Sequence, residues 1–163
     1  MEVASALPRL ARVKSQLYFI HLTGEADYEA VAEDYVKYDF HGEVAAFSPD
    51  MPQLMHRAHL VVSRAGASTL AELTALGRAA VLVPYPFAAN NHQEYNARFL
   101  AQAGAAELIL NKDFTREGFS DKIQQFLAQP DALAHMEAHS LTLAKPHAAQ
   151  DIVQGCLELV EGG

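Results

Sequence analysis

Short apolar runs alternate with amphipathic segments along this chain, and that alternation most constrains the fold. Each segment between the runs repeats its apolar side chains at helical spacing. Because the runs are short and nearly continuous in apolar residues, the strands should be buried on both faces. The sequence therefore predicts an α/β fold, a Rossmann-like parallel sheet with helices on both faces. The strands are expected at residues 17–22, 44–47, 60–63, 79–83 and 108–110.

The segments between the runs predict the helices. Gly104 should end one of them in the left-handed conformation. Two or three more should follow residue 110, with breaks near Pro130 and Pro146. No internal repeat or linker divides the chain, so residues 1–163 are expected to form one domain. The other helices are expected at residues 3–14, 26–38, 51–57, 68–76 and 93–103.

The amino-acid composition excludes several classes of function. Lys and Arg number 12 against 20 Asp and Glu, a formal net charge of −8, so a nucleic-acid partner is not expected. The single cysteine, Cys156, excludes an internal disulfide and is expected in the core with Ile152 and Leu159. No apolar run approaches the ~18 residues of a membrane-spanning helix. A soluble, cytoplasmic type of domain is expected.

The turn after the run at residues 60–63 is the first candidate site. It leads from a β-branched strand through small residues into a helix. Gly66 allows a positive φ and the close approach of a ligand. Unpaired amides at the helix N-terminus favour an anion, and phosphate or diphosphate fits best. The candidate residues are Arg64, Gly66, Ala67, Ser68 and Thr69.

Glu72 lies about one helical turn after Ser68, on the same face of the predicted helix. A carboxylate there suits sugar hydroxyls, such as those of ribose, better than phosphate. The alternative is a capping box, in which Ser68 or Thr69 is the N-cap and Glu72 its partner. The local pattern leaves both interpretations open.

The loop after the run at residues 79–83 is the second candidate. It leaves the carboxyl end of a strand, the edge at which open α/β sheets bind ligands. Asn91, His92 and Gln93 offer amide and imidazole groups that hydrogen-bond neutral hydroxyls, as a sugar requires. Ordinary loop and capping chemistry is an equally good explanation of these residues.

A third candidate follows the run at residues 44–47. Backbone groups around Ser48 can bind the edge of a flat base, and Met51 can pack on its face. The alternative, which the local pattern favours, is a helix start capped by Asp50.

Together these stretches resemble the MurG family of glycosyltransferases. The resemblance rests on VVSRAGASTLAE at residues 61–72, VPYP at 83–86, NHQEYNA at 91–97 and AGA at 103–105. That family has the two-domain GT-B fold and adds N-acetylglucosamine to lipid I, which makes lipid II for peptidoglycan. The resemblance covers nearly the whole chain as the C-terminal, donor-binding half.

The resemblance implies a role for each candidate residue. The Gly66 turn, with the residues up to Thr69, would hold the diphosphate of UDP-N-acetylglucosamine. Ser68 stands where relatives often carry leucine, so its amide rather than its hydroxyl is assigned the contact. Glu72 would bind ribose, the region of Phe47, Ser48 and Met51 would hold uracil, and His92 and Gln93 would contact the sugar. No metal or cofactor is implied, because amides and the helix dipole stabilise the diphosphate.

Two parts of the family pattern are absent from the sequence. One is the acceptor-binding N-terminal domain, with its catalytic base and membrane-docking surface, so no catalytic residue is assigned here. The other is the first strand of the donor domain with its glycine-rich loop. In the usual order 3-2-1-4-5-6 that strand is central. We therefore expect a gap, a direct pairing of the two flanking strands, or a strand borrowed from a neighbour.

The function implied is inverting transfer of N-acetylglucosamine from UDP to lipid I at the cytoplasmic face of the membrane. The chain alone is expected to bind the UDP-sugar and to be catalytically silent. Three alternatives remain: the donor subunit of a two-chain glycosyltransferase, a non-hydrolysing UDP-sugar epimerase, and a non-catalytic nucleotide-binding module. For the epimerase, the expected set of two acidic residues and a histidine is not evident.

Overall fold

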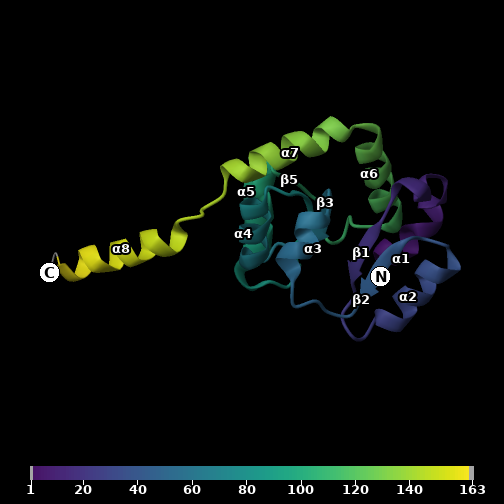
Figure 1. Cartoon of the computed structure of the whole chain (residues 1–163), viewed down its shortest axis with the longest axis horizontal. Coiled ribbons are helices and arrows are strands. Elements are labelled where there is room, and N and C mark those ends of the chain that lie inside the picture. The colour runs from purple at the N-terminus through teal and green to yellow at the C-terminus, as the bar shows by residue number, and fades with distance from the viewer. Residues whose placement is uncertain (1, 162–163) are drawn as a thin grey trace.

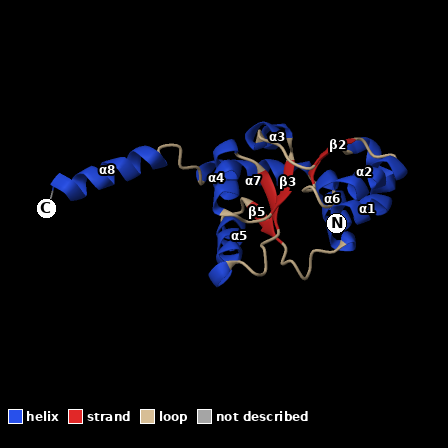
Figure 2. Ribbon diagram, turned by 90° about the horizontal axis from the view of Figure 1, so that it is seen from below, coloured by secondary structure: helices blue, strands red, loops and turns tan. Residues whose placement is uncertain are grey.

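The computed structural model describes residues 2–161, and its strands form two separate parallel sheets. One sheet pairs β1 with β2, and the other has the order β3-β4-β5. In Figure 2, β2 of the first sheet lies apart from β3 and β5 of the second. Every pairing is parallel, and helices connect the strands, so the predicted α/β class is confirmed. The strands are β1 Phe19–Leu22, β2 Gly42–Ala45, β3 Leu60–Ser63, β4 Ala79–Leu82 and β5 Ala106–Leu108.

The helices follow the predicted order closely (Figure 1). Three helices follow β5, with Pro130 at the start of the second. Gly104 ends the helix before β5 with φ +73, as expected. The helices are α1 Glu2–Ala6, α2 Tyr28–Lys37, α3 Met51–Arg57, α4 Ala67–Leu76, α5 His92–Gln102, α6 Arg116–Ala128, α7 Pro130–Thr142 and α8 Ala148–Glu161, with 3₁₀ helices η1 Leu7–Gln16 and η2 Ala89–Asn91.

The first helix differs from its prediction. A single helix was expected over residues 3–14, but α1 ends at Ala6 and the chain continues as the 3₁₀ helix η1. Pro8 explains the change, because proline has no amide to donate to a carbonyl four residues back. The backbone therefore winds more tightly after that point.

Strand β4 forms the centre of the larger sheet. All of its residues are buried, because β3 and β5 pair with its two edges and helices cover both faces. Ala80 and Leu82 pack on the side of α4 and α5, whereas Ala79 and Val81 pack on the side of α6 and α7. This is the burial that the continuous apolar run predicts.

The two sheets do not join. Among residues 2–161, no strand pairing links β1 to β3, although the usual doubly wound order places a strand between them. Of the three outcomes expected for the absent strand, the structure shows the gap. β1 and β3 are half-buried along their whole length, in contrast to β4.

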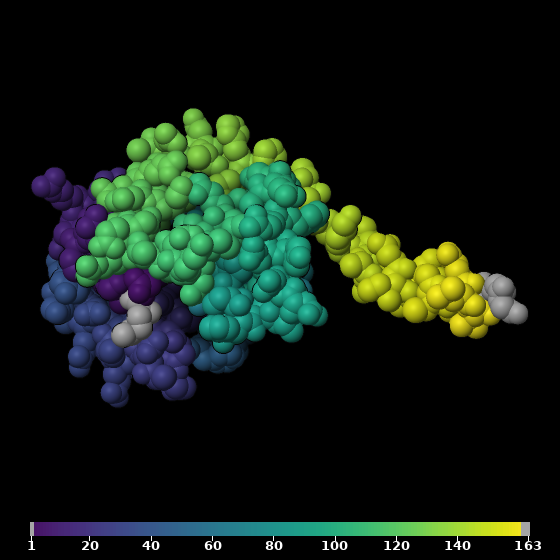
Figure 3. Space-filling model, turned by 180° about the vertical axis from the view of Figure 1, so that it is seen from behind, coloured from purple at the N-terminus to yellow at the C-terminus, as the bar shows by residue number. Residues whose placement is uncertain are grey.

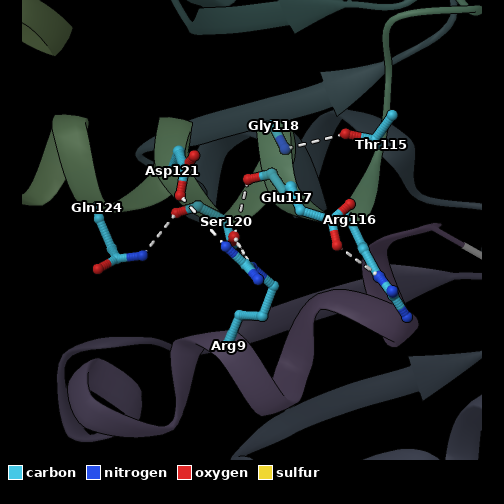
Figure 4. A network of polar contacts seen from close by, with 8 residues as sticks. All are labelled: Arg9, Thr115, Arg116, Glu117, Gly118, Ser120, Asp121 and Gln124. Carbon is cyan, nitrogen blue, oxygen red and sulfur yellow. Dashed lines mark hydrogen bonds and ion pairs between the residues drawn. The ribbon is translucent and has the colours of Figure 1, made fainter.

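One helical layer nevertheless covers both sheets. A single apolar cluster contains Leu7 of η1 and Phe119 of α6, and Phe19 of β1 and Val62 of β3 both pack against it. Polar contacts hold this layer together (Figure 4). The Nε of Arg9 in η1 donates to the buried Ser120 Oγ in α6 at 3.0 Å.

Helix α8 extends away from the rest of the molecule (Figures 1 and 3). Its apolar side chains are exposed, including Ile152, Leu157 and Leu159. Cys156 is exposed as well, so its predicted place in the core is wrong. The apolar spacing of the helix was recognised correctly, but spacing does not reveal whether another element covers the stripe. None of the helices that the structure describes is long and apolar enough to cross a membrane.

Candidate functional site

The predicted site residues follow the carboxyl ends of the strands. Because β3 and β4 are adjacent and parallel, the turn after β3 and the loop after β4 leave the same edge of the larger sheet. The Ser48 segment follows β2 of the smaller sheet, and α3 brings it toward α4. Met51 of α3 packs on the same cluster as Ala65 of the turn. The turn after β3 and the loop after β4 therefore meet near the start of α4, where Gln93 contacts both, and α3 packs on α4 beside them.

The first turn of α4 is open to a ligand. Its N-cap is Gly66, which provides no side-chain capping bond, and Ala67 and Ser68 are exposed. Among residues 2–161, no protein group accepts a hydrogen bond from the amides of Ala67, Ser68 or Thr69. The capping-box alternative is therefore wrong, since neither Ser68 nor Thr69 is the N-cap. Three aligned free amides with the helix dipole behind them can bind an anion.

Gly66 does not have the predicted conformation. Its φ is −68 and its ψ is 148, an extended geometry that any residue adopts. A Cβ at this position would meet only Thr69 Oγ1, at 3.8 Å. Protein packing therefore does not require glycine here. The remaining reason for a glycine at this position is the close approach of a ligand to its backbone.

Glu72 stands one turn along α4, half-buried. In the described part of the chain its carboxylate takes no hydrogen bond or ion pair. The carboxylate is therefore free to accept hydrogen bonds from hydroxyl groups near the open turn.

Gln93 joins the two loops of the larger sheet. Its Oε1 accepts from the Ala65 amide at 3.2 Å and from the Tyr85 amide at 2.9 Å. Asn96, one turn later on α5, donates its Nδ2 to the Ala65 carbonyl at 3.0 Å. The side-chain oxygen of Gln93 thus positions the two loops, and its Nε2 makes no hydrogen bond within residues 2–161.

Arg64 also ties loops together. Its Nη1 donates to the carbonyls of Val83 and Pro84, at 3.1 and 3.2 Å, and to Asn111 Oδ1 at 2.7 Å. Its guanidinium lies 5.7 Å from the Tyr85 ring centre. These contacts describe an anchor between the ends of β3, β4 and β5. Direct contact of Arg64 with a ligand stays a prediction.

The asparagines of the second candidate have an unusual backbone. Asn90 and Asn91 have φ values of 50 and 55, and asparagine tolerates this left-handed region better than most residues. The chain thereby turns sharply into α5. The Nδ1–H of His92 donates to the Ala89 carbonyl at 2.8 Å, which leaves Nε2 of the exposed ring as an acceptor.

At the third candidate the structure confirms the capping interpretation, and the base contact stays a prediction. Asp50 caps α3, since its Oδ1 accepts from the Gln53 amide at 3.2 Å. Ser48 Oγ accepts from the Asp50 amide, also at 3.2 Å. The Ser48 side chain is therefore engaged in the turn. Its backbone amide and carbonyl make no hydrogen bond within residues 2–161, and these are the groups that the base contact would use.

A hollow of about 220 Å³ adjoins the second candidate. It lies between the loop after β4 and the segment after β5, beside Asn91 and Glu94. Asn111 and Lys112 form its other wall. Sequence reasoning missed Asn111 as well as Asn96. The only signal for Asn111 was its place after an apolar strand, whereas Asn96 lies within a recognised motif.

Comparisons with known proteins give a family and a set of relatives. Residues 2–153 match the model of the glycosyltransferase family 28 C-terminal domain. A curated relative from Thermodesulfovibrio yellowstonii is 45% identical over 93% of this chain and 42% of its own length. A relative from Myxococcus xanthus is 39% identical over 97% of this chain and 41% of its own. Both are named UDP-N-acetylglucosamine--N-acetylmuramyl-(pentapeptide) pyrophosphoryl-undecaprenol N-acetylglucosamine transferase.

Solved structures agree with this result. MurG of Acinetobacter baumannii superposes with a TM-score of 0.77 at 32% identity, over 93% of this chain and 48% of that one. The glycosyltransferase VinC, solved in complex with dTDP, gives a TM-score of 0.70 at 19% identity over 98% of this chain and 38% of its own, and supports the fold alone. The chain spans about two fifths of the length of the curated relatives it matches. The family match covers most of the chain, the relatives are MurG-like, and the structure has a Rossmann-like sheet with an open helix N-terminus. The chain therefore belongs to glycosyltransferase family 28 and corresponds to the C-terminal domain of that family.

Proposed function

We propose that this chain binds UDP-N-acetylglucosamine as the donor half of a transferase that converts lipid I to lipid II in peptidoglycan synthesis. The observation that carries the proposal is the open first turn of α4, with Glu72 one turn beyond it. The names of the relatives support the choice of donor sugar and acceptor. The acceptor, the catalytic base and a peripheral contact with the cytoplasmic face of the membrane are assigned to the rest of such an enzyme.

Each segment of the site has one part of the donor to bind. The amides of Ala67, Ser68 and Thr69 face the diphosphate, and Glu72 accepts from the ribose hydroxyls. The backbone of Ser48 and the side chain of Met51 border the uracil. His92 Nε2, Gln93 Nε2 and the polar groups of Asn91 are available to the sugar. The segments thus offer backbone amides for a diphosphate and groups that hydrogen-bond hydroxyls for the two sugar rings.

The donor-binding half of the enzyme contributes stabilisation of the leaving group. In inverting transfer, the acceptor hydroxyl forms a bond to the anomeric carbon while the bond from that carbon to the diphosphate oxygen breaks. UDP leaves with the electron pair, and the hydroxyl proton goes to a base outside this chain. Negative charge grows on the diphosphate in the transition state. Fixed amides at a helix N-terminus stabilise that charge without reorganising.

Ala67→Pro tests the anion contact directly. Proline is well suited to the first position of a helix, and Gly66 already has the extended backbone that precedes proline. The substitution removes one amide and should leave the fold intact. We expect calorimetric affinity for UDP and UDP-N-acetylglucosamine to fall about tenfold, the loss of one charge-assisted hydrogen bond. Binding of uridine, which has no phosphate, should not change. Unchanged UDP affinity would remove this turn from the site.

Glu72→Ala tests the ribose contact. We expect the affinities for UDP-N-acetylglucosamine, UDP and UDP-glucose to fall alike, about tenfold, because the three ligands share the ribose. Glu33→Ala, at an exposed position on α2, is the matched control and should leave all three unchanged. A loss confined to one sugar, or no loss at all, would contradict the assignment of Glu72.

A further inference from the structure

Ala65, which leads into the open turn of α4, is held by two side chains of α5. Its amide donates to Gln93 Oε1 at 3.2 Å, and its carbonyl accepts from Asn96 Nδ2 at 3.0 Å. Ala65 has 0% exposure and packs in the same cluster as Ala97 of α5. Both backbone polar groups of this buried residue are therefore fixed by one helix.

The hydrogen bond from Asn96 also fixes the direction of the next amide. In a trans peptide, the carbonyl of one residue and the amide hydrogen of the following residue point in opposite directions. The described part of the chain contains no cis peptide bond, so this holds for the unit that joins Ala65 to Gly66. Because the Ala65 carbonyl points toward Asn96, the Gly66 amide points away from α5.

The Gly66 amide is a fourth free donor beside the three at the start of α4. Among residues 2–161, no group accepts a hydrogen bond from it. A Cβ at Gly66 would meet only Thr69 Oγ1, at 3.8 Å, so the space beside this residue is open. Unpaired amides before and within the first turn of a helix need a partner from outside the helix.

We propose that Asn96 is a positioning residue for the diphosphate of the donor, and that the Gly66 amide is the group it positions. This inference rests on the proposed function, which assigns the diphosphate to the open turn. Asn96 acts through the Ala65 carbonyl and is given no contact with the donor itself. An amide that is already oriented stabilises a phosphate oxygen without reorganising when the ligand binds.

A purely structural role for Asn96 makes a different prediction, and α4 offers a matched control for it. In the last turn of α4, the Leu73 carbonyl accepts from Ser140 Oγ of α7 at 3.3 Å, and both residues have 0% exposure. Ser140→Ala therefore removes a side-chain donor from a backbone carbonyl, as a change at Asn96 does, but at the end of α4 away from the open turn.

The first measurement uses the unmodified chain. Amide-resolved NMR spectra are recorded while UDP is added, and uridine is the control ligand because it has no phosphate. We expect the Gly66 amide to shift with UDP, together with the amides of residues 67–69, and not to shift with uridine. A Gly66 amide that stays in place while the other three respond to UDP would overturn the proposal. No response at any of the four would contradict the proposed function and this proposal with it.

The second measurement uses Asn96→Leu, which removes the donor but keeps the net charge and a similar volume. UDP should bind about tenfold more weakly, the loss of one charge-assisted hydrogen bond, and uridine affinity should not change. The Gly66 amide should lose its response to UDP, whereas the Thr69 amide should keep it. Ser140→Ala should leave the affinity for UDP unchanged.

Three results would overturn the positioning role of Asn96. They are an unchanged UDP affinity in Asn96→Leu, equal losses for UDP and uridine, and an equal loss of UDP affinity in Ser140→Ala. The first measurement needs no variant, so it decides the matter by itself if Asn96→Leu does not fold. UDP binding by the unmodified chain, with a response at residues 67–69, keeps the proposed function standing in each of these cases.

Discussion

The two sheets of this molecule differ although their sequences predict the same kind of strand. In the β3–β5 sheet, β4 is fully buried, and side chains from α5 tie the loops at its edge. In the β1–β2 sheet, every strand residue is half-buried or exposed. The loops that follow these strands form mainly local hydrogen bonds, such as the one from the Gln53 amide to Asp50 Oδ1. The β3–β5 sheet has a central strand, β4, that is paired at both edges, and the β1–β2 sheet has no such strand. A strand's burial is therefore set by its neighbours as much as by its own residues.

The largest expected effect comes from truncating one leucine in each sheet and comparing the losses of stability. Leu82 of β4 has 0% exposure, whereas Leu22 of β1 is half-buried. Leu82→Ala should lower the free energy of unfolding by about 3–5 kcal/mol, because it leaves a cavity that cannot collapse. Leu22→Ala should cost about 1 kcal/mol, since water already reaches the site. Equilibrium urea unfolding measures both. Equal losses would show that the two sheets are equally packed.

A smaller effect is expected where Gln93 joins the loops. Gln93→Leu keeps a similar volume but leaves the amide of the fully buried Ala65 without its acceptor. Unfolding free energy should fall by about 1–2 kcal/mol, the cost of one buried unsatisfied donor. UDP should also bind more weakly, as the turn before α4 loosens. Gln102→Leu, at the exposed end of the same helix, is the control and should change neither quantity.

The smallest expected effect lies in the β1–β2 sheet and depends on pH. Burial lowers the pKa of His21 below its ordinary value near 6.5, and His21 Nδ1 lies 3.2 Å from Tyr35 Oη. Because the folded pKa is lower than the unfolded one, His21 favours the fold above pH ~6.5, and that contribution is lost as the pH falls through the folded pKa. The urea midpoint should therefore fall from pH 7 to pH 5.

The matched variants identify the group responsible for that slope. His21→Leu should lose less of its stability between pH 7 and pH 5 than the unmodified chain does. His41→Leu, at an exposed position just before β2, should keep the original slope. If both variants have the slope of the unmodified chain, His21 is not the source.

Local sequence chemistry located most of the elements and the open turn. The bounds of α3 and β3 agree with the prediction residue for residue, because Asp50 and Pro52 start the helix and β-branched residues form the strand. The free amides after Gly66 follow from a strand–turn–helix pattern and the backbone alone. The segments around Ser48, Gly66 and Gln93 were all placed at strand ends by their position in the alternation.

Long-range contacts decided the rest. Whether Cys156 is buried depends on whether another element covers α8, and the helix periodicity is the same in either case. The engagement of Gln93 Oε1 with two backbone amides depends on how α5 packs against β3 and β4.

By itself, the sequence determined the class of fold, the order of its elements and the helix start with free amides after Gly66, because periodicity and turn residues act over a few residues. Only the tertiary structure decided that the sheet divides between β1 and β3 and that Gln93 and Arg64 hold the loops. Strand pairing and loop anchoring join residues far apart in the chain, and no local pattern records which partners they meet.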